Sequence, residues 1–177
     1  MKSLPLEPVK QIAAVLYRSE DDLEYALKLL SASFSPVDYR GASFPFVHSH
    51  YYEEEMGSGL QRLMISFERL VSPGCLAAAK HSAKKLEEQL ARNGNRTVNL
   101  DIGYLDLFKL ILASYKGRGN KIYVGDWIWA DMILYFEKGD FQPFLWSFPD
   151  FKSGIYHNDL REIRSIYRRQ LKEFRDS

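Results

Sequence analysis

The apolar and polar positions of the first hundred residues switch between a strand pattern and a helix pattern. A nearly continuous apolar run at 9–17 predicts a buried strand, and apolar residues three or four apart at 23–34 predict a helix. Ser19 and Asp22 resemble a capping box, which places the start of this helix just after Ser19. The segment 62–70 predicts another strand, with Leu63, Ile65 and Phe67 on one face.

The next helix has both a start and a stop signal. Ser72-Pro73 supplies a hydroxyl cap followed by proline at the first helical position, and Asn93-Gly94 ends the helix. Its inner stripe is Leu76, Ala79, Ala83, Leu86 and Leu90. A short strand follows at 97–100, and the apolar run from Gly103 to Ser114 is predicted to be a helix.

The last third of the chain has the pattern of a β-meander and a terminal helix. Strands are predicted at 121–124, 127–137 and 141–146, with turns between them that contain glycine. A helix follows at about 158–174. Its apolar stripe lies beside a stripe of basic residues that either binds phosphates or faces solvent.

With an irregular strand within 36–50, the order up to residue 100 is strand, helix, strand, strand, helix, strand. This order predicts an α+β fold: a ferredoxin-like split βαβ sandwich, in which helices cover an antiparallel sheet, extended by a C-terminal β-meander and a terminal helix. No repeat or linker divides the chain, so residues 1–177 are predicted to form a single domain.

Composition narrows the class of protein. Apolar residues make up 46% of the chain and charged residues 27%, as in globular domains, and the net charge of +1 gives no general attraction to nucleic acids or acidic membranes. The single cysteine, Cys75, cannot form an intramolecular disulfide or anchor a cysteine-rich zinc site. The N-terminus lacks an apolar signal region, and no apolar run reaches membrane-spanning length. These features predict a cytoplasmic protein without membrane or nucleic-acid partners.

The sequence lacks the common catalytic and nucleotide-binding motifs. It contains no phosphate loop GxxxxGK[ST], no GxGxxG, no GxSxG and no HExxH. Gly117 and Gly119 form only a GxG that follows a predicted helix instead of a strand. The sequence therefore identifies no cofactor and leaves open whether the protein is an enzyme.

Two carboxylates are singled out by their surroundings. Asp101 lies between an apolar strand and Gly103, where it binds a cation, acts as a general base or caps the next helix. Asp131 shares one face of the 127–137 strand with Trp127, Trp129, Ile133 and Tyr135, whereas the core face is Ile128, Ala130, Met132, Leu134 and Phe136. The first set either holds a flat ring whose edge binds Asp131, or forms a second aromatic core layer under the last helix, with Asp131 paired to a basic residue.

Two further groups lie close together before the 62–70 strand. His48 and His50 are two residues apart, so on a strand they could share a metal with nearby glutamates; in a loop they face water. Tyr51 and Tyr52, followed by three glutamates, either line a ligand pocket by stacking and hydrogen bonding or form an exposed loop.

Five blocks of the sequence carry a resemblance to a known family. They are YYEEEMG at 51–57, RTVNLDIGY at 96–104, LASYK at 112–116, GDWIWAD at 125–131 and WSFPDF at 146–151. In order and spacing they resemble the bacterial and archaeal domain-of-unknown-function family 4416. Some of its members are labelled GTP-binding, which this sequence does not support because it lacks a phosphate loop.

The resemblance also indicates which candidate residues are typical of that family. The family pattern has the residues of this chain at Tyr51, Tyr52, Glu55, Met56, Gly57, Arg62, Arg96, Asn99, Asp101, Gly103, Tyr104, Ser114 and Lys116. His50 stands where the family usually has an acidic residue and His48 where it has an apolar one, which argues against a two-histidine metal site. Asp131 replaces Glu and keeps the charge, while Trp127 and Trp129 replace Gly and Tyr.

These candidates lead to three hypotheses. The first is a protein that binds an anionic or ring-bearing small molecule, such as a nucleotide, in a pocket whose cations hold negative groups and whose tyrosines stack. The predicted pocket residues are Tyr51, Tyr52, Arg62, Arg96, Asp101, Tyr104, Lys116 and Asp131. The second is a metal-dependent hydrolase with Glu55, Asp101 and Asp131 as oxygen ligands for magnesium or manganese. The third is a protein–protein assembly module. The sequence does not determine the oligomeric state.

Overall fold

The computed structural model describes residues 6–47, 49 and 51–177. The strands are β1 (Val9–Tyr17), β2 (Val37–Arg40), β3 (Phe44–Pro45), β4 (Gln61–Val71), β5 (Val98–Leu105), β6 (Lys109–Ser114), β7 (Ile122–Gly125), β8 (Ile128–Glu137) and β9 (Asp140–Pro143). The helices are α1 (Glu20–Ser33), α2 (Glu53–Met56), α3 (Leu76–Leu90, preceded by a 3₁₀ turn at Pro73–Cys75), α4 (Pro149–Lys152) and α5 (His157–Asp176). The fold is therefore α+β, as predicted.

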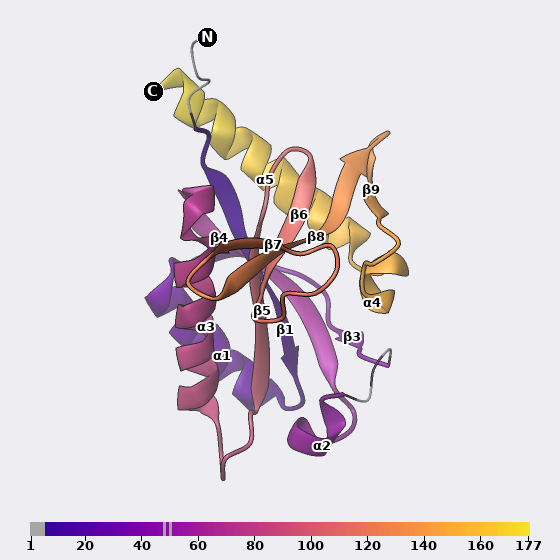
Figure 1. The fold of residues 1–177 in the computed structure, drawn as a ribbon. Coiled ribbons are helices and arrows are strands. Elements are labelled where there is room, and N and C mark those ends of the chain that lie inside the picture. Colours follow the sequence, from indigo (N-terminus) through magenta and orange to yellow (C-terminus); the bar gives the residue numbers. More distant parts are fainter. Residues whose placement is uncertain (1–5, 48, 50) are drawn as a thin grey trace.

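Within the described residues, the nine strands form one antiparallel sheet with two helical layers (Figure 1). The strand order is β2-β4-β1-β5-β6-β8-β7, with β3 beside β4 and β9 beside β8. β1 lies between β4 and β5 and is buried on both faces, which explains its continuous apolar run. Alternate β1 side chains pack under α1 and α3 on one face and under α5 on the other.

The predicted caps lie at the start of α1 and of the 3₁₀ turn that leads into α3. The Ser19 hydroxyl accepts a hydrogen bond from the Asp22 N–H at 3.5 Å, and the Ser72 hydroxyl accepts one from the Gly74 N–H at 3.3 Å. Each bond satisfies a backbone donor that the first helical turn leaves free. The predicted inner stripe of α3 is buried together with the α1 side of the sheet.

The helix predicted between Gly103 and Ser114 is wrong. This segment forms the second half of β5, a turn, and β6, because the Asp106 carboxylate accepts hydrogen bonds from the Phe108 and Lys109 N–H groups and closes a hairpin. Gly103 permits the close pairing, since a β-carbon there would collide with the Ile111 carbonyl oxygen. The apolar run is buried on both faces, and such a run has no periodicity that separates strand from helix.

The C-terminal meander forms β7, β8 and β9, with three differences from the predicted pattern. The last strand, predicted at 141–146, ends at Pro143. Asp126 and Trp127 form the β7–β8 turn with positive φ angles of 48° and 61°, so Trp127 lies outside the strand. Leu110 pairs with Leu134 and Ile111 with Met132, so Ile133 is an extra residue, a β-bulge. The bulge moves the core residues after it from the α3 layer to the α5 layer.

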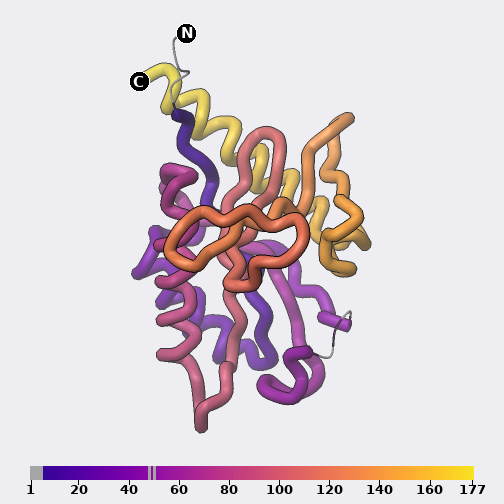
Figure 2. The backbone as a smooth tube through the Cα atoms, viewed as in Figure 1, coloured from indigo at the N-terminus to yellow at the C-terminus, as the bar shows by residue number. Residues whose placement is uncertain are grey.

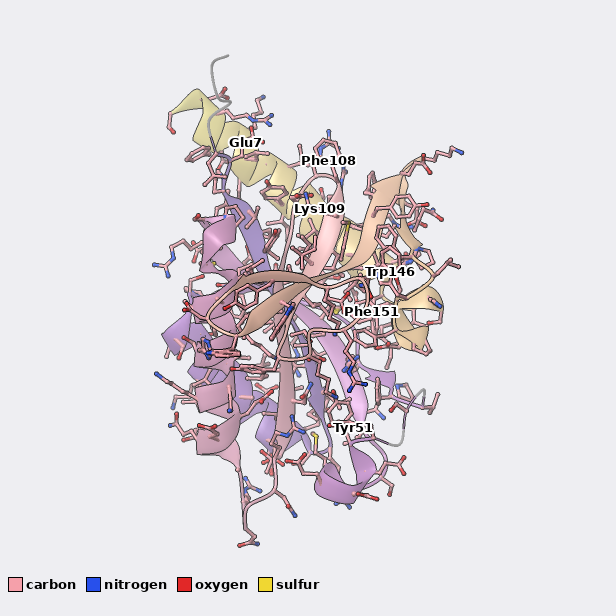
Figure 3. All side chains as sticks on the ribbon, in the orientation of Figure 1. Glu7, Tyr51, Phe108, Lys109, Trp146 and Phe151 are labelled. Carbon is pink, nitrogen blue, oxygen red and sulfur yellow. The ribbon has the colours of Figure 1, made fainter. Side chains whose placement is uncertain are left out.

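The two ends of the described chain meet at one end of the molecule. Arg175, near the end of α5, forms an ion pair with Glu7 at 2.5 Å. Phe108 and Lys109, at the tip of the β5–β6 hairpin, lie at the same end, whereas Tyr51 lies near the opposite end (Figure 3). Among the described helices, none combines the length and apolar character needed to cross a membrane.

Candidate functional site

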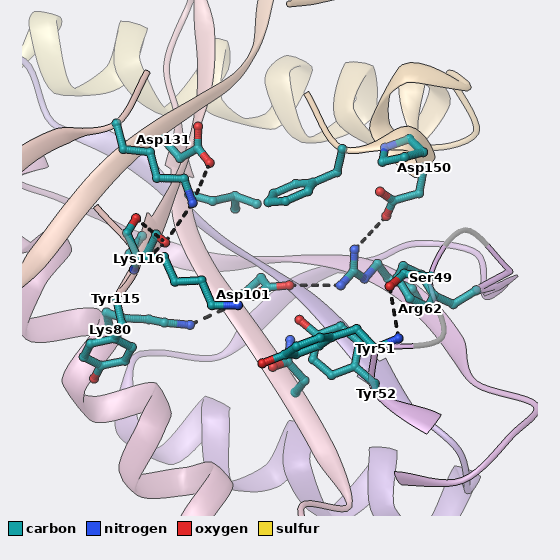
Figure 4. A pocket seen from close by; sticks show the side chains of 18 residues that line it. Ser49, Tyr51, Tyr52, Arg62, Lys80, Asp101, Tyr115, Lys116, Asp131 and Asp150 are labelled. Carbon is teal, nitrogen blue, oxygen red and sulfur yellow. Dashed lines mark hydrogen bonds and ion pairs between the residues drawn. The ribbon is translucent and has the colours of Figure 1, made fainter. Parts of the chain in front are cut away.

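The sheet opens between β5 and β6. These strands pair only where Gly103–Leu105 face Leu110–Leu112; the rest of β5 stays with β1, while β6 stays with β8. We call this opening the β5–β6 fork. A cavity of about 330 Å³ occupies it, lined by the strands, by Lys80 of α3, and by the loops around 46–52, 115–121 and 148–150 (Figure 4).

Polar side chains of α3 complete the hydrogen bonding of β5 at the fork. Lys80 Nζ donates to the Leu100 carbonyl oxygen at 3.0 Å, and Glu87 Oε1 accepts from the Leu100 N–H at 2.5 Å. Strand separation would otherwise leave these buried backbone groups without partners. Burial raises the pKa of Glu87. Lys80 and Glu87 therefore let the sheet open without losing backbone hydrogen bonds.

A chain of charges crosses the cavity wall. Arg62 of β4 is 4% exposed and donates to Asp150 at 2.6 Å and to Asp101 at 3.0 Å, while Lys80 Nζ lies 3.9 Å from Asp101 (Figure 4). Burial alone would lower the pKa of Arg62, but the charges of Asp101 and Asp150 outweigh it and raise that pKa. The guanidinium group also lies 4.5 Å from the centre of the Phe46 ring. Arg62 is therefore held in one position.

A second ion pair lines the β8 side of the cavity. Lys121 Nζ lies 3.2 Å from an Asp131 oxygen and donates to the Ser114 hydroxyl at 2.9 Å. The Asn120 amide donates to the other Asp131 oxygen at 2.7 Å. Asp131 is thus paired with a basic residue, as one of the two alternatives predicted. Both of its oxygens have partners.

Lys116 differs from the other cavity cations. Its Nζ lies 4.6 Å from the centre of the Tyr51 ring, and no carboxylate of the described residues lies within 4.0 Å of it. Tyr51 meets Tyr52 edge to face at 5.0 Å. Burial, with the charge of Asp101 as the next cause, raises the pKa of Tyr52, so its phenol stays protonated and can donate a hydrogen bond.

The structure brings six of the eight predicted pocket residues together. The lining includes Tyr51, Tyr52, Arg62, Asp101, Lys116 and Asp131. Asp101 is in the middle of β5, so the helix cap proposed for it is wrong. Its side chain shares the Asn99 face of the strand, opposite the buried Leu100 and Ile102.

Arg96 does not line the cavity but contacts side chains that do. It binds both oxygens of Glu55 at 2.6 to 3.0 Å and donates to Asn99 Oδ1 at 2.8 Å. Its guanidinium group lies 5.6 Å from the centre of the Tyr52 ring. The hydrogen bonds from Arg96 lower the pKa of Glu55. This pair, which we call the α2 anchor, fixes α2 to the start of β5.

Tyr104 is the other residue outside the site. It lines a separate cavity of about 270 Å³ together with Asp106, Phe108 and Tyr167. Phe108 lies at the tip of the β5–β6 hairpin (Figure 3). The separation follows from strand alternation, because Tyr104 lies an odd number of residues from Asp101 and therefore faces the opposite side of the sheet.

The proposed metal ligands do not form a common site. Glu55 is held by Arg96 outside the cavity, while Asp101 and Asp131 each contact a cation. Across residues 6–47, 49 and 51–177, no group of three or more His, Cys, Asp or Glu side chains could hold a metal ion. His48 and His50 lie outside the described residues.

Several lining residues were missed in the sequence. Lys80 and Glu87 are seven residues apart, so they lie on the same buried side of α3 as the apolar stripe. Two charged residues on an apolar helix face need polar partners, and this pattern could have indicated the fork. Asp150 follows Pro149 in the aromatic block at 146–151. Nothing local distinguishes Lys121 from a solvated lysine, since its role depends on strand pairing.

Comparison with known proteins gives one match. The family described as "Domain of unknown function (DUF4416)" matches residues 7–167. Neither a curated protein nor a solved structure matches the chain.

Proposed function

The chain belongs to the DUF4416 family, and we propose that its cavity binds a small molecule that carries both an aromatic ring and an anionic group, such as a nucleotide. The observation that carries this proposal is the surplus positive charge. The lining has four cations, Arg62, Lys80, Lys116 and Lys121, and three carboxylates, Asp101, Asp131 and Asp150, which leaves 4 − 3 = +1.

The surplus positive charge of the lining belongs to Lys116. Arg62, Lys80 and Lys121 contact the three carboxylates, so their charges are balanced within the wall. Lys116 is exposed and has no carboxylate partner in the described chain. An ammonium group of this kind attracts an anion at low cost, because no internal ion pair has to break first. We assign the anionic group of the ligand to Lys116.

The aromatic part of the ligand is supported by the remaining walls. Phe46, Tyr51, Tyr52, Tyr115 and Phe148 all line the cavity. Aromatic walls with a few convergent polar groups are typical of small-molecule sites, and a planar ring stacks on them without needing one fixed sequence of hydrogen bonds.

Buried donors on the wall support a ligand that carries acceptor atoms. Asn99 Nδ2 and Arg62 Nε have no hydrogen-bond partner among the described residues, although both side chains are at least nine-tenths buried. An unpaired buried donor costs roughly 1–3 kcal/mol, so a ligand acceptor that reached either of these donors would recover part of that energy.

Thermal unfolding with three classes of compound tests the proposal. We expect a nucleotide to stabilise the protein at lower concentration than either the matching nucleoside or inorganic phosphate, because only the nucleotide engages both the rings and Lys116. A ligand at one hundred times its dissociation constant adds about 2.7 kcal/mol of stability. No stabilisation by nucleotides or by aromatic phosphates and carboxylates at millimolar concentration would refute the proposal.

A pair of variants separates specific from general charge effects. Lys116→Gln should remove most of the stabilisation by the anionic ligand. Lys85→Gln, which removes another exposed lysine from α3, should leave it unchanged. Equal losses in both variants would mean that the compounds bind through general surface charge.

We extend the proposal to the fold of the N-terminal half, which we infer to be a ferredoxin-like sandwich. The order β2-β4-β1-β5, the antiparallel pairing and the position of α1 and α3 on one face support it. A crystal structure with another strand order in this half would contradict it.

A further inference from the structure

The outer edge of β7 is an apolar surface without a partner strand among residues 6–47, 49 and 51–177. β7 ends the strand order, so one of its edges makes no sheet hydrogen bonds to the described residues. Its Ile122, Tyr123 and Val124 are 66%, 56% and 45% exposed. Figure 2 shows the β7–β8 hairpin crossing the front of the molecule. Such an edge is a template for pairing with another strand.

The opposite end of the strand order is built differently. β2 carries Asp38 and Arg40, and these charges are used: Asp38 pairs with Lys10, and Arg40 contacts Glu24 of α1. Charged residues on an edge strand discourage pairing with a foreign strand. Ile122–Gly125 of β7 has no charged residue and no proline. The β7 edge therefore lacks the charges that discourage strand pairing at the β2 edge.

Trp127 adds a second observation. It has a left-handed φ of 61° and is 77% exposed, so it adopts an unfavourable backbone conformation without packing in the core. Position 127 follows Asp126, whose φ is 48°, in a turn where the second residue is usually glycine. Strained residues that gain no internal contact point to a role in binding. An exposed indole is the side chain most enriched at binding hot spots.

The charges at the ends of β7 identify the partner. Arg118 lies four residues before the strand, ahead of the turn at Gly119 and Asn120, and Asp126 follows the strand directly. Neither side chain has an ion pair or hydrogen bond with the described residues. In an antiparallel pair of identical strands, the basic end of each lies beside the acidic end of the other. We propose that two copies of this chain associate by antiparallel pairing of their β7 edges, with Arg118 of each near Asp126 of the other and the two Trp127 rings covering the apolar strands.

The dissociation constant measured by sedimentation velocity over a wide concentration range tests this proposal. We expect a concentration-dependent dimer that Tyr123→Lys weakens at least tenfold. Phe108→Lys, which changes an even more exposed aromatic residue at another hairpin tip, should leave the dissociation constant unchanged. A protein that stays monomeric at all concentrations, or one that loses the dimer equally in both variants, would overturn the proposal.

Two further variants distinguish self-pairing from any other association. Arg118→Glu should weaken the dimer because it places like charges together twice, and the double variant Arg118→Glu/Asp126→Lys should restore it because both pairs regain opposite charges. Trp127→Gly should raise the thermal stability of the monomer by relieving strain while it weakens the dimer. Failure of the double variant to recover affinity, in a folded protein, would exclude the two-fold arrangement.

Discussion

Arg62 in the cavity and Arg96 in the α2 anchor were predicted to serve the same pocket, yet they occupy two different environments. Arg62 is 4% exposed and bridges two carboxylates. Arg96 is 28% exposed at its side chain, holds the Glu55 carboxylate in a two-pronged contact outside the cavity, and lies 3.9 Å from a Glu87 oxygen. Both guanidinium groups are already engaged by the protein, whereas the neighbouring Lys116 is not. The number of internal partners, more than the type of charge, separates structural cations from cations that are available to a ligand.

The two arginines should also differ in how much their removal lowers the free energy of unfolding. Removing one member of a buried ion pair strands the remaining charge in a poorly solvated place, whereas removing one member of a partly exposed pair lets water solvate the other. The same substitution should therefore have very different effects at Arg62, Arg96 and Lys116. The predictions that follow run from the largest effect to the smallest.

Arg62→Met should lower the free energy of unfolding by about 3–5 kcal/mol, because it leaves Asp150 buried without its cation and Asp101 with only the more distant Lys80. Urea or guanidinium unfolding measures this loss. In the double variant Arg62→Met/Asp150→Asn, part of the stability should return, since the stranded charge is gone. A loss below about 1 kcal/mol in the single variant would show that Arg62 is not a structural cation.

Arg96→Met should lower the free energy of unfolding by about 1–2 kcal/mol through loss of charge-assisted hydrogen bonds to Glu55. The matched control is Arg161→Met, which breaks a more exposed ion pair with Asp140 and should cost no more than about 0.5 kcal/mol. Equal effects of the two substitutions would remove the distinction between the α2 anchor and an ordinary surface pair.

The stabilising effect of the α2 anchor should depend on pH. Arg96 lowers the pKa of Glu55 from its ordinary value of 4.5, so the pair contributes stability above that value and loses it as pH falls through the lowered pKa. The gap in unfolding free energy between the native chain and Arg96→Met should be constant near neutral pH and should narrow as pH falls below 4.5. Unfolding curves at a series of pH values measure this gap, and a gap that widened in acid would contradict the assignment.

Lys116→Gln should change the free energy of unfolding by less than about 0.5 kcal/mol, because this exposed cation has no carboxylate partner to strand. The measurement is the same unfolding curve, recorded without ligand. Together with a lost ligand response, an unchanged stability would mark Lys116 as a binding residue. A large loss of stability would instead place it among the structural cations with Arg62.

The elements that sequence patterns predicted best are those whose signals are local. The Ser19 and Ser72 caps and the strand pattern at 62–70 each depend on a few neighbouring residues, and the structure has helices and a strand at those places. The β5–β6 hairpin was missed because Leu110–Ala113 is buried on both faces. Its identity depends on Asp106 closing a turn and on Gly103 accepting a close neighbour, and both effects require the partner strand.

The candidate site was predictable in part for a similar reason. Six residues were chosen for their chemistry and share a cavity, although one of the alternatives for Asp101, a helix cap, was wrong: Asp101 faces the fork from a strand. Lys80 and Lys121 reach the site through helix packing and strand pairing that no short motif encodes. The bulge at Ile133 likewise reassigns the faces of β8 through one unpaired residue.

The ion pair between Glu7 and Arg175 has a practical consequence for handling the protein. Because it brings both ends of the described chain to one end of the molecule, a purification tag or surface tether at either end would leave from there, away from Tyr51 at the cavity mouth (Figure 3). A short linker between the two ends, with new termini opened in the exposed Asn93-Gly94 turn, should yield a circular permutant that keeps the fork intact.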